Sequence, residues 1–359
     1  MAKAGEAMLV PMPELQRACV ASEAKLGQVL QRLALLFQPP LTRASRAALR
    51  DGLAEAEAAV ARLSWLWGQN LLQQRGETLP LLHPDRVFFE RLRQRLAQWP
   101  AIAEALHRVI RQASLPLLPD LPSPDSALAV QGSLQDRIWA RVHGAQAPPG
   151  LRPAIRANGQ YEDIPYPVQD FLRQMQLARR VGVVLGKAQL RFLDVGCGTG
   201  LKVMMAAEML GQADGLEYLP NLAASARRML RRAGMGHSRV HIGDALRFDG
   251  FAGYDLIYFY KPIHDPDQLS ALEARIVAQA RPGTILIAPY AGFAQRRNGQ
   301  GCSPVAGHVH VTGREARKMG QLLRHVQAVG FGDPRPPADP PQGFVAPLAA
   351  VLRAWGHLT

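Results

Sequence analysis

Apolar residues recur at helical spacing through the first third of the chain. The clearest stripe steps by three or four positions, with Arg and Glu on the other helix faces: Leu49, Leu53, Ala56, Val60, Leu63 and Trp67. Similar stripes run through residues 26–36 and 89–110, and Pro39-Pro40 separates the first two helices. Because helices joined by short proline-containing turns are typical of an antiparallel bundle, we expect an all-α helical accessory domain over residues 1–115.

The pattern changes after a Pro-rich stretch over residues 116–153, which we interpret as a linker. Helices and strands then alternate. Helices are expected at 168–185, 201–210, 221–233 and 268–280, and strands at 191–195, 213–217, 239–242, 254–260 and 284–288. This alternation predicts an α/β domain over residues 154–332, with a mostly parallel sheet and helices on both faces. Residues 333–359 read as a Pro-rich segment and a C-terminal helix.

The first predicted strand leads directly into a glycine-rich turn, FLDVGCGTG (residues 192–200), and a helix opens after it. Asp194 precedes three glycines at alternate positions: Gly196, Gly198 and Gly200. Glycines let the backbone approach a ligand closely, and the helix N-terminus adds amide donors and a positive potential. The G-x-G-x-G spacing differs from the dinucleotide fingerprint, whose third glycine would fall on Leu201, and the Gly-Lys-Ser/Thr of a P-loop is absent.

Two further acids end the next two predicted strands. A carboxylate at Glu217, at the end of the second strand, can accept both hydroxyls of a ribose. Asp244, which stands between Gly243 and Ala245 after the third strand, can accept a hydrogen bond from an exocyclic adenine amine. The three acids therefore predict a nucleoside site at the carboxyl ends of the strands.

In these motifs, over roughly residues 191–288, the sequence resembles the class I S-adenosylmethionine-dependent methyltransferases. The resemblance implies a Rossmann-like seven-stranded sheet and S-adenosyl-L-methionine as cofactor. The methionine end would lie at Asp194 and the glycine turn, the ribose at Glu217, and the adenine at Asp244 beside the Tyr218 ring. The implied cofactor-binding residues are Asp194, Gly196, Cys197, Gly198, Gly200, Glu217, Tyr218, Asp244 and Ala245.

The end of the fourth strand is where this family usually places its acceptor chemistry. It reads YKPI (residues 260–263), whereas enzymes that methylate adenine or glutamine amino groups typically have Asn/Asp-Pro-Pro-Tyr/Phe there. This departure argues against those two acceptors. Because the sulfonium donor is already activated, a base is needed only if the acceptor must lose a proton. The candidate catalytic residues are Tyr260, Lys261 and His264.

Two other segments are candidates for covering the donor or contacting the acceptor. Residues 160–166 (QYEDIPY) precede the helix that leads into the first strand, where the family often places a lid, and they supply Tyr161 and Tyr166. A long Gly-containing loop predicted over residues 292–307 supplies Arg296 and Arg297.

The chain has 42 Lys and Arg against 29 Asp and Glu, a formal net charge of +13. This excess allows an anionic partner but does not require one. A cluster of arginines follows the second strand and could contact phosphates, although we favour a solvated helix end: Arg227, Arg228, Arg231 and Arg232.

Three scattered cysteines do not form a disulfide framework, and the sequence has no apolar stretch long enough for a membrane span. We therefore expect a cytoplasmic protein without membrane association. Cys302, His308 and His310 do not have the spacing of a standard zinc site, so we expect no metal.

These observations predict a methyltransferase that uses S-adenosylmethionine, with a macromolecule, RNA or protein, as acceptor. Two alternatives remain: a small-molecule methyltransferase, and a non-catalytic methyltransferase-fold protein that serves in binding or assembly. In each case we expect the N-terminal helices to bind a partner or to form a homo-oligomer.

Overall fold

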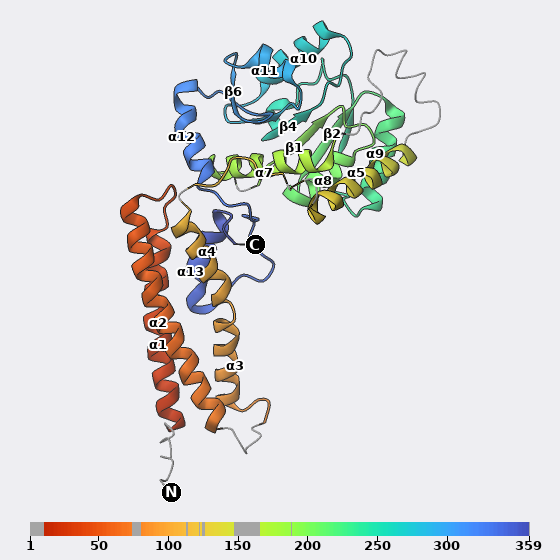
Figure 1. Cartoon of the computed structure of the whole chain (residues 1–359). Coiled ribbons are helices and arrows are strands. Elements are labelled where there is room, and N and C mark those ends of the chain that lie inside the picture. Colours follow the sequence, from red (N-terminus) through yellow and green to blue (C-terminus); the bar gives the residue numbers. More distant parts are fainter. Residues whose placement is uncertain are drawn as a thin grey trace. The chain divides into compact units, whose positions relative to one another are not determined.

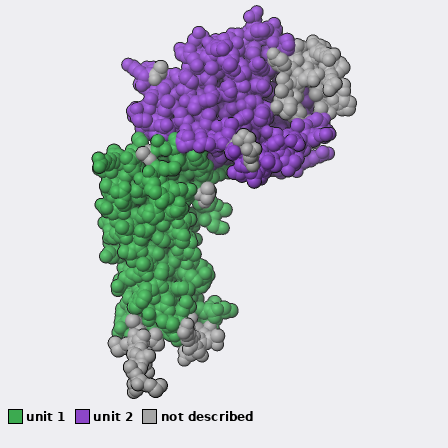
Figure 2. Space-filling model, in the orientation of Figure 1, with its two compact units in different colours: residues 1–115, 328–359 green, residues 116–327 purple. Residues whose placement is uncertain are grey.

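The apolar stripes of the first third form α-helices in the computed structural model of the chain (Figure 1). The structure describes residues 11–73, 80–112, 114–121, 123, 126–146, 166–187 and 189–358. It divides into two units, one of residues 1–115 and 328–359 and the other of residues 116–327 (Figure 2). No helix in the described ranges is both long and apolar enough to cross a membrane.

The first unit is a helical bundle with its own apolar core. Its helices are α1 (Met12–Leu36), α2 (Arg43–Gln73), α3 (Pro84–Leu96), α4 (Trp99–Arg111) and α13 (Ala346–Ala354), with the 3-10 turn η2 (Gly343–Val345) before α13. Leu30 and Leu33 of α1, Leu53 of α2, and Leu348 and Leu352 of α13 are buried in one cluster. The C-terminal helix thus completes the core of the N-terminal bundle, whereas the sequence analysis placed residues 333–359 apart from it.

The second unit contains a seven-stranded sheet in the order β3-β2-β1-β4-β5-β7-β6. Its strands are β1 (Phe192–Val195), β2 (Ala213–Glu217), β3 (Val240–Ile242), β4 (Leu256–Phe259), β5 (Ile285–Ile287), β6 (Cys302–Ala306) and β7 (Val309–Thr312). The pairs among β1 to β5 are parallel, and β7 runs antiparallel to both of its neighbours. The predicted Rossmann-like sheet is confirmed.

Helices cover both faces of the sheet. On one face, α7 (Val168–Val184), α8 (Leu201–Leu210), α9 (Pro220–Arg232) and α12 (Ala316–Gln327) share a core with Phe192, Leu256 and Tyr258. The other face packs Leu193, Ile257 and Phe259 against α10 (Pro266–Gln279), α11 (Ala291–Arg297) and the 3-10 turn η1 (Phe251–Gly253). Because β1 lies between β2 and β4, the strand order reverses there, and the ligand crevice of such a sheet opens at the carboxyl ends of these strands.

The segment after β5 differs from the expected long loop over residues 292–307. Residues 291–297 form α11, and β6 and β7 form an antiparallel hairpin at the sheet edge. The hairpin contains an irregularity between Pro304 and Ala306, and its turn uses Gly307 in the left-handed region. A proline and a bulge in so short a strand obscured the alternation by which strands are recognised.

The predicted linker 116–153 contributes structure to the second unit. Helix α5 (Ala127–Gln146) packs against α7. Arg173 donates to the Pro119 carbonyl at 2.7 Å. Arg180, which is 2% exposed, donates to the carbonyls of Pro116 and Leu117, both at 2.6 Å, and of Val326 at 2.8 Å. Burial lowers the pKa of Arg180 to about 10, so the guanidinium is charged at neutral pH.

We expect Arg180→Met to lower the free energy of unfolding by about 3 kcal/mol, because it leaves buried carbonyl groups without their donor. The shift of the urea midpoint, followed by circular dichroism, measures this change. Arg324→Gln, at an exposed position of α12, is the control and should change stability by less than about 0.5 kcal/mol. Equal losses in the two variants would contradict the bridging role of Arg180.

Candidate functional site

The glycine turn, residues 196–200, links β1 to α8 and is fixed to the neighbouring strand. The amides of Gly196 and Cys197 both donate to the Leu216 carbonyl of β2, at 2.8 and 3.1 Å. Gly196 has φ 78° and Gly200 has φ 84°, and a Cβ on Gly200 would lie 2.9 Å from the Cβ of Ala226 in α9. Only glycine accommodates this backbone without strain, so the turn holds its shape through close packing against β2 and α9.

Glu217 fastens the turn from the second strand. Its carboxylate is buried, and it accepts the Gly198 amide at one oxygen and the Leu219 amide at the other, each at 2.9 Å. The residue predicted to hold a ribose therefore also fixes the backbone of the turn.

The other predicted cofactor residues lie along the same edge of the sheet. Asp194 is buried within β1, and Asp244 follows β3, where it accepts the Leu246 amide at 2.9 Å. Tyr218, directly after Glu217, is 46% exposed. Ala245 packs at the margin of the core on the α10 face. Because β1, β2 and β3 are neighbours, the structure places the three acids at the ends of consecutive strands.

Three tyrosines gather beside Asp194. The ring centroids of Tyr166 and Tyr260 are 5.2 Å apart, and those of Tyr166 and Tyr258 are 6.4 Å apart. Tyr258 lies opposite Asp194 in the register of β1 and β4. Its ring is 1% exposed, and its hydroxyl has no hydrogen-bond partner among the described residues. A buried hydroxyl without a partner indicates a place where a ligand or water completes the bonding.

The phenols of Tyr166 and Tyr258 are poorly suited to act as bases. Burial raises the pKa of Tyr166 to about 12, with a further increase from Asp170. Burial, together with the nearby Asp194 carboxylate, also raises the pKa of Tyr258 well above its usual value. Both tyrosines are therefore protonated at neutral pH and offer a hydroxyl donor in place of a phenolate base.

Of the three predicted catalytic residues, only Tyr260 belongs to the tyrosine cluster. Lys261 adopts φ 45°, the one positive value among the described non-glycine residues, and its ammonium lies 5.9 Å from the ring centroid of Tyr290. His264 is exposed in the turn before α10. Lys261 thus directs its charge towards Tyr290, and a left-handed lysine at a strand end is an unusual conformation for a residue with a Cβ.

The predicted acceptor or lid residues have different surroundings from those expected. Arg296 donates to the buried carboxylate of Glu273 at 2.7 and 2.9 Å, and Arg297 pairs with the same carboxylate at 3.4 Å. Both arginines therefore anchor α11 on α10, and the expected loop around them is a helix and a strand. Tyr161 lies outside the described residues, whereas Tyr166 lies in the tyrosine cluster.

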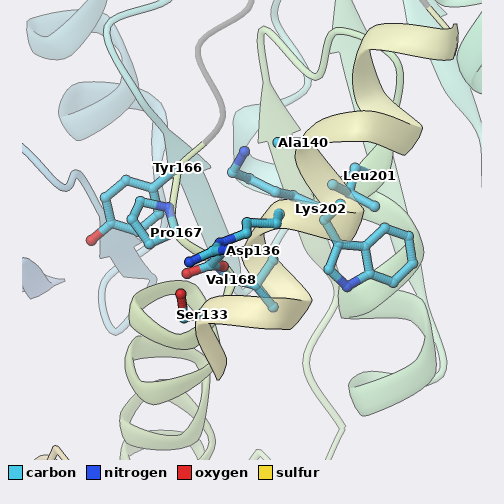
Figure 3. Close-up of a pocket in the computed structure, with 10 residues that line it drawn as sticks. Ser133, Asp136, Ala140, Tyr166, Pro167, Val168, Leu201 and Lys202 are labelled. Carbon is cyan, nitrogen blue, oxygen red and sulfur yellow. The ribbon is translucent and has the colours of Figure 1, made fainter. Parts of the chain in front are cut away.

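A cavity of about 480 Å³ adjoins the glycine turn (Figure 3), and the sequence pattern did not predict it. Its walls are α5, residues 166–168 and the first residues of α8. Helix α5 falls within the predicted linker, residues 116–153, whose sequence gave no sign of a ligand site. The single available signal was Lys202, a lone cation two residues after Gly200.

In the described ranges, no group of three or more His, Cys, Asp and Glu side chains is arranged to hold a metal ion. His310 is buried in β7, and its ring meets Phe293 edge to face at 5.0 Å. Burial lowers the pKa of His310, so the ring is neutral in this apolar setting.

Residues 158–299 match the family described as Protein-L-isoaspartate(D-aspartate) O-methyltransferase. Protein-L-isoaspartate O-methyltransferase 2 of Archaeoglobus fulgidus is 30% identical over 114 residues, which cover 30% of this chain and 52% of that protein. Protein-L-isoaspartate O-methyltransferase of Syntrophus aciditrophicus is 27% identical over 123 residues, covering 33% of this chain and 56% of that protein. The chain thus spans about half the length of these curated relatives.

Among solved structures, an RNA methyltransferase from Salinibacter ruber in complex with S-adenosyl-L-homocysteine is 22% identical, with a TM-score of 0.32. That similarity covers 41% of this chain and 91% of that chain.

The matched residues 158–299 contain the glycine turn, the three acids at the strand ends and the tyrosine cluster. They begin before the first strand of the sheet and end after the fifth. In the structure the sheet has the seven strands that the resemblance implied, with the glycine turn at the point where the strand order reverses. Glu217, a buried acid at the end of the second strand, stands where the resemblance implied the ribose of the cofactor. The second unit therefore has the fold and the donor-site motifs of the class I S-adenosylmethionine-dependent methyltransferases, whose cofactor is S-adenosyl-L-methionine.

Proposed function

We propose that this chain transfers a methyl group from S-adenosylmethionine to a carboxylate oxygen of a protein or peptide. The observation that carries the proposal is the match of residues 158–299 to a carboxyl O-methyltransferase family, because this segment holds both the glycine turn and the tyrosine cluster. The buried site supplies hydroxyl donors with raised pKa values, and a carboxylate acceptor needs no base.

The residues at the strand ends fit the two ends of the donor. Glu217, at the end of β2, accepts the ribose hydroxyls, and Asp244, after β3, accepts a hydrogen bond from the adenine amine. Asp194, whose register partner in β4 is Tyr258, lies near the end of β1 beside the glycine turn, where we expect the methionine end. The donor supplies a methyl group already activated on a positively charged sulfur. The protein therefore acts by orienting the acceptor in line and by excluding water.

A carboxylate suits this site because it is ionised at neutral pH, well above its usual pKa of about 4. When it attacks, an oxygen–carbon bond forms, the sulfur–carbon bond breaks, and the bonding electrons stay on sulfur. No proton is released, so the reaction needs no ionised tyrosine.

The bonds made by several arginines support a protein acceptor over RNA. Arg227 donates to the Val240 carbonyl, Arg228 donates to the Ser225 hydroxyl, and Arg296 is paired with Glu273. Guanidinium groups held by the protein in this way are less available to phosphates. In this proposal the helical unit, which has its own core, binds a protein partner or a second copy of the chain.

We expect Glu217→Ala to weaken donor binding by at least about tenfold, because it removes the ribose acceptor and the anchor of the Gly198 amide. Isothermal titration with S-adenosylmethionine measures the dissociation constant. Glu315→Gln, an exposed position beyond the sheet, is the control and should bind like the wild type. Wild-type affinity in Glu217→Ala would refute the assigned donor site.

We expect the wild-type chain to methylate a peptide that contains an L-isoaspartyl residue, and to leave the same peptide unlabelled when its free carboxylates are amides. The rate should be flat from about pH 6 to about pH 9, because the acceptor is ionised throughout that range. Transfer of a labelled methyl group, followed by release of methanol in alkali, identifies the ester. Alkali-stable label, or label in RNA or in a small-molecule fraction of a cell extract, would assign another acceptor. Donor binding without any transfer would support the non-catalytic alternative.

A further inference from the structure

The cavity beside the glycine turn has three walls from separate parts of the second unit. Ser133, Asp136 and Ala140 of α5 form one wall, Tyr166 and its two following residues form the second, and the start of α8 forms the third (Figure 3). A volume of about 480 Å³ is suited to a small organic ligand or to a few residues of a peptide.

Lys202 brings a cation to the α8 wall. It lies in the first turn of α8, two residues after Gly200, and is half-buried. Its ammonium is 5.8 Å from the ring centroid of Tyr258, and it forms no ion pair with any described residue. The α8 N-terminus adds positive potential at the same place, so this wall favours an anion.

The α5 wall does not neutralise that charge. Asp136, the acid that lines the cavity, accepts the Val168 amide at 2.7 Å, so its carboxylate caps the start of α7. The next residue, Arg137, also lines the cavity and adds a second cation. The charged groups of the lining are therefore two cations and one carboxylate that is already hydrogen-bonded.

The buried polar atoms next to the cavity provide independent evidence for a ligand. The Tyr258 hydroxyl, on the ring that underlies Lys202, has no partner among the described residues. The oxygen of the buried Gln174 side-chain amide also has no partner among the described residues, while its nitrogen donates to the Tyr166 hydroxyl at 2.7 Å. Buried polar atoms are rarely left without partners, so a ligand that brings hydrogen-bonding groups to Tyr166 and Tyr258 would complete this network.

We propose that this cavity is the acceptor site, and that Lys202, assisted by Arg137, binds a carboxylate of the acceptor peptide. The inference rests on the proposed function and specifies its acceptor recognition. Lys202 is a positioning residue: it holds the carboxylate next to the glycine turn, where the donor's methionine end lies. The ring of Trp139, which also lines the cavity, packs against the apolar part of the peptide.

The test is a thermodynamic cycle that removes the charged side chain, the peptide carboxylate, or both. A fluorescently labelled peptide with an L-isoaspartyl carboxylate, and the same peptide with amides in place of its carboxylates, are titrated with full-length chain saturated with S-adenosyl-L-homocysteine. Fluorescence anisotropy gives both affinities for the wild type, Lys202→Met and Arg137→Gln. The matched controls are Arg141→Gln, one helical turn further along α5 and outside the cavity lining, and Lys318→Met, exposed on α12.

We expect the wild type and both controls to bind the carboxylate peptide at least about tenfold more tightly than the amide peptide. In Lys202→Met this preference should fall below about threefold, while the affinity for the amide peptide and for S-adenosyl-L-homocysteine stays unchanged. Arg137→Gln should reduce the preference to a smaller extent. An unchanged affinity for S-adenosyl-L-homocysteine also verifies that the Lys202→Met variant is folded.

Three results would overturn the inference. In the first, the wild type binds both peptides equally or binds neither. In the second, Lys202→Met keeps the full preference for the carboxylate peptide. In the third, Lys202→Met weakens the binding of S-adenosyl-L-homocysteine and leaves peptide binding unchanged, which would assign the lysine to the donor site. The proposed function and the proposed acceptor site can fail independently. Lys202-dependent binding without methyl ester formation would refute only the function, and ester formation that is insensitive to Lys202→Met would refute only the site.

Discussion

The buried carboxylate of Glu217 is the group on which the proposed donor site depends. It joins the amide of Gly198, in the turn after β1, to the amide of Leu219, in the turn after β2. Two loops that belong to different strands therefore take one fixed relative position before any ligand arrives. Since backbone amides next to a negative charge form stronger hydrogen bonds than neutral pairs do, one side chain holds both turns. The position of α8, and with it Lys202 at one wall of the cavity, follows from this anchoring.

The sequence was sufficient for the features that depend on local pattern. The strands from 192 to 287 were predicted because short apolar runs alternate with amphipathic helices, and the glycine turn was predicted because its glycines stand at fixed spacing after Asp194. The three acids were placed together because the carboxyl ends of neighbouring parallel strands share one edge of the sheet. These inferences need only the order of the strands, which the family resemblance supplied.

The features that depend on distant partners were not predictable in this way. Arg296 and Arg297 read as free cations in a loop, because their partner Glu273 lies on a different helix and is itself indistinguishable from a surface acid in the sequence. The unpartnered hydroxyl of Tyr258 was not predicted, because a tyrosine within a buried strand is common and its hydrogen-bond partners depend on neighbours that the sequence does not reveal. The wall formed by α5 was missed since its position against α7 is a tertiary contact of a helix with weak amphipathic character.

The three carbonyls held by Arg180 belong to Pro116, Leu117 and Val326, which stand at the two ends of the second unit. The methyltransferase unit is therefore an insertion whose first and last residues are joined by a single guanidinium group. The helical unit, in contrast, is discontinuous, because α13 supplies part of its core. During synthesis, α1 to α4 emerge before the inserted unit, but they lack that part of their core until α13, which follows the inserted unit, is made. The inserted unit can complete its fold earlier, and closure of its ends would bring the two pieces of the bundle within reach of each other.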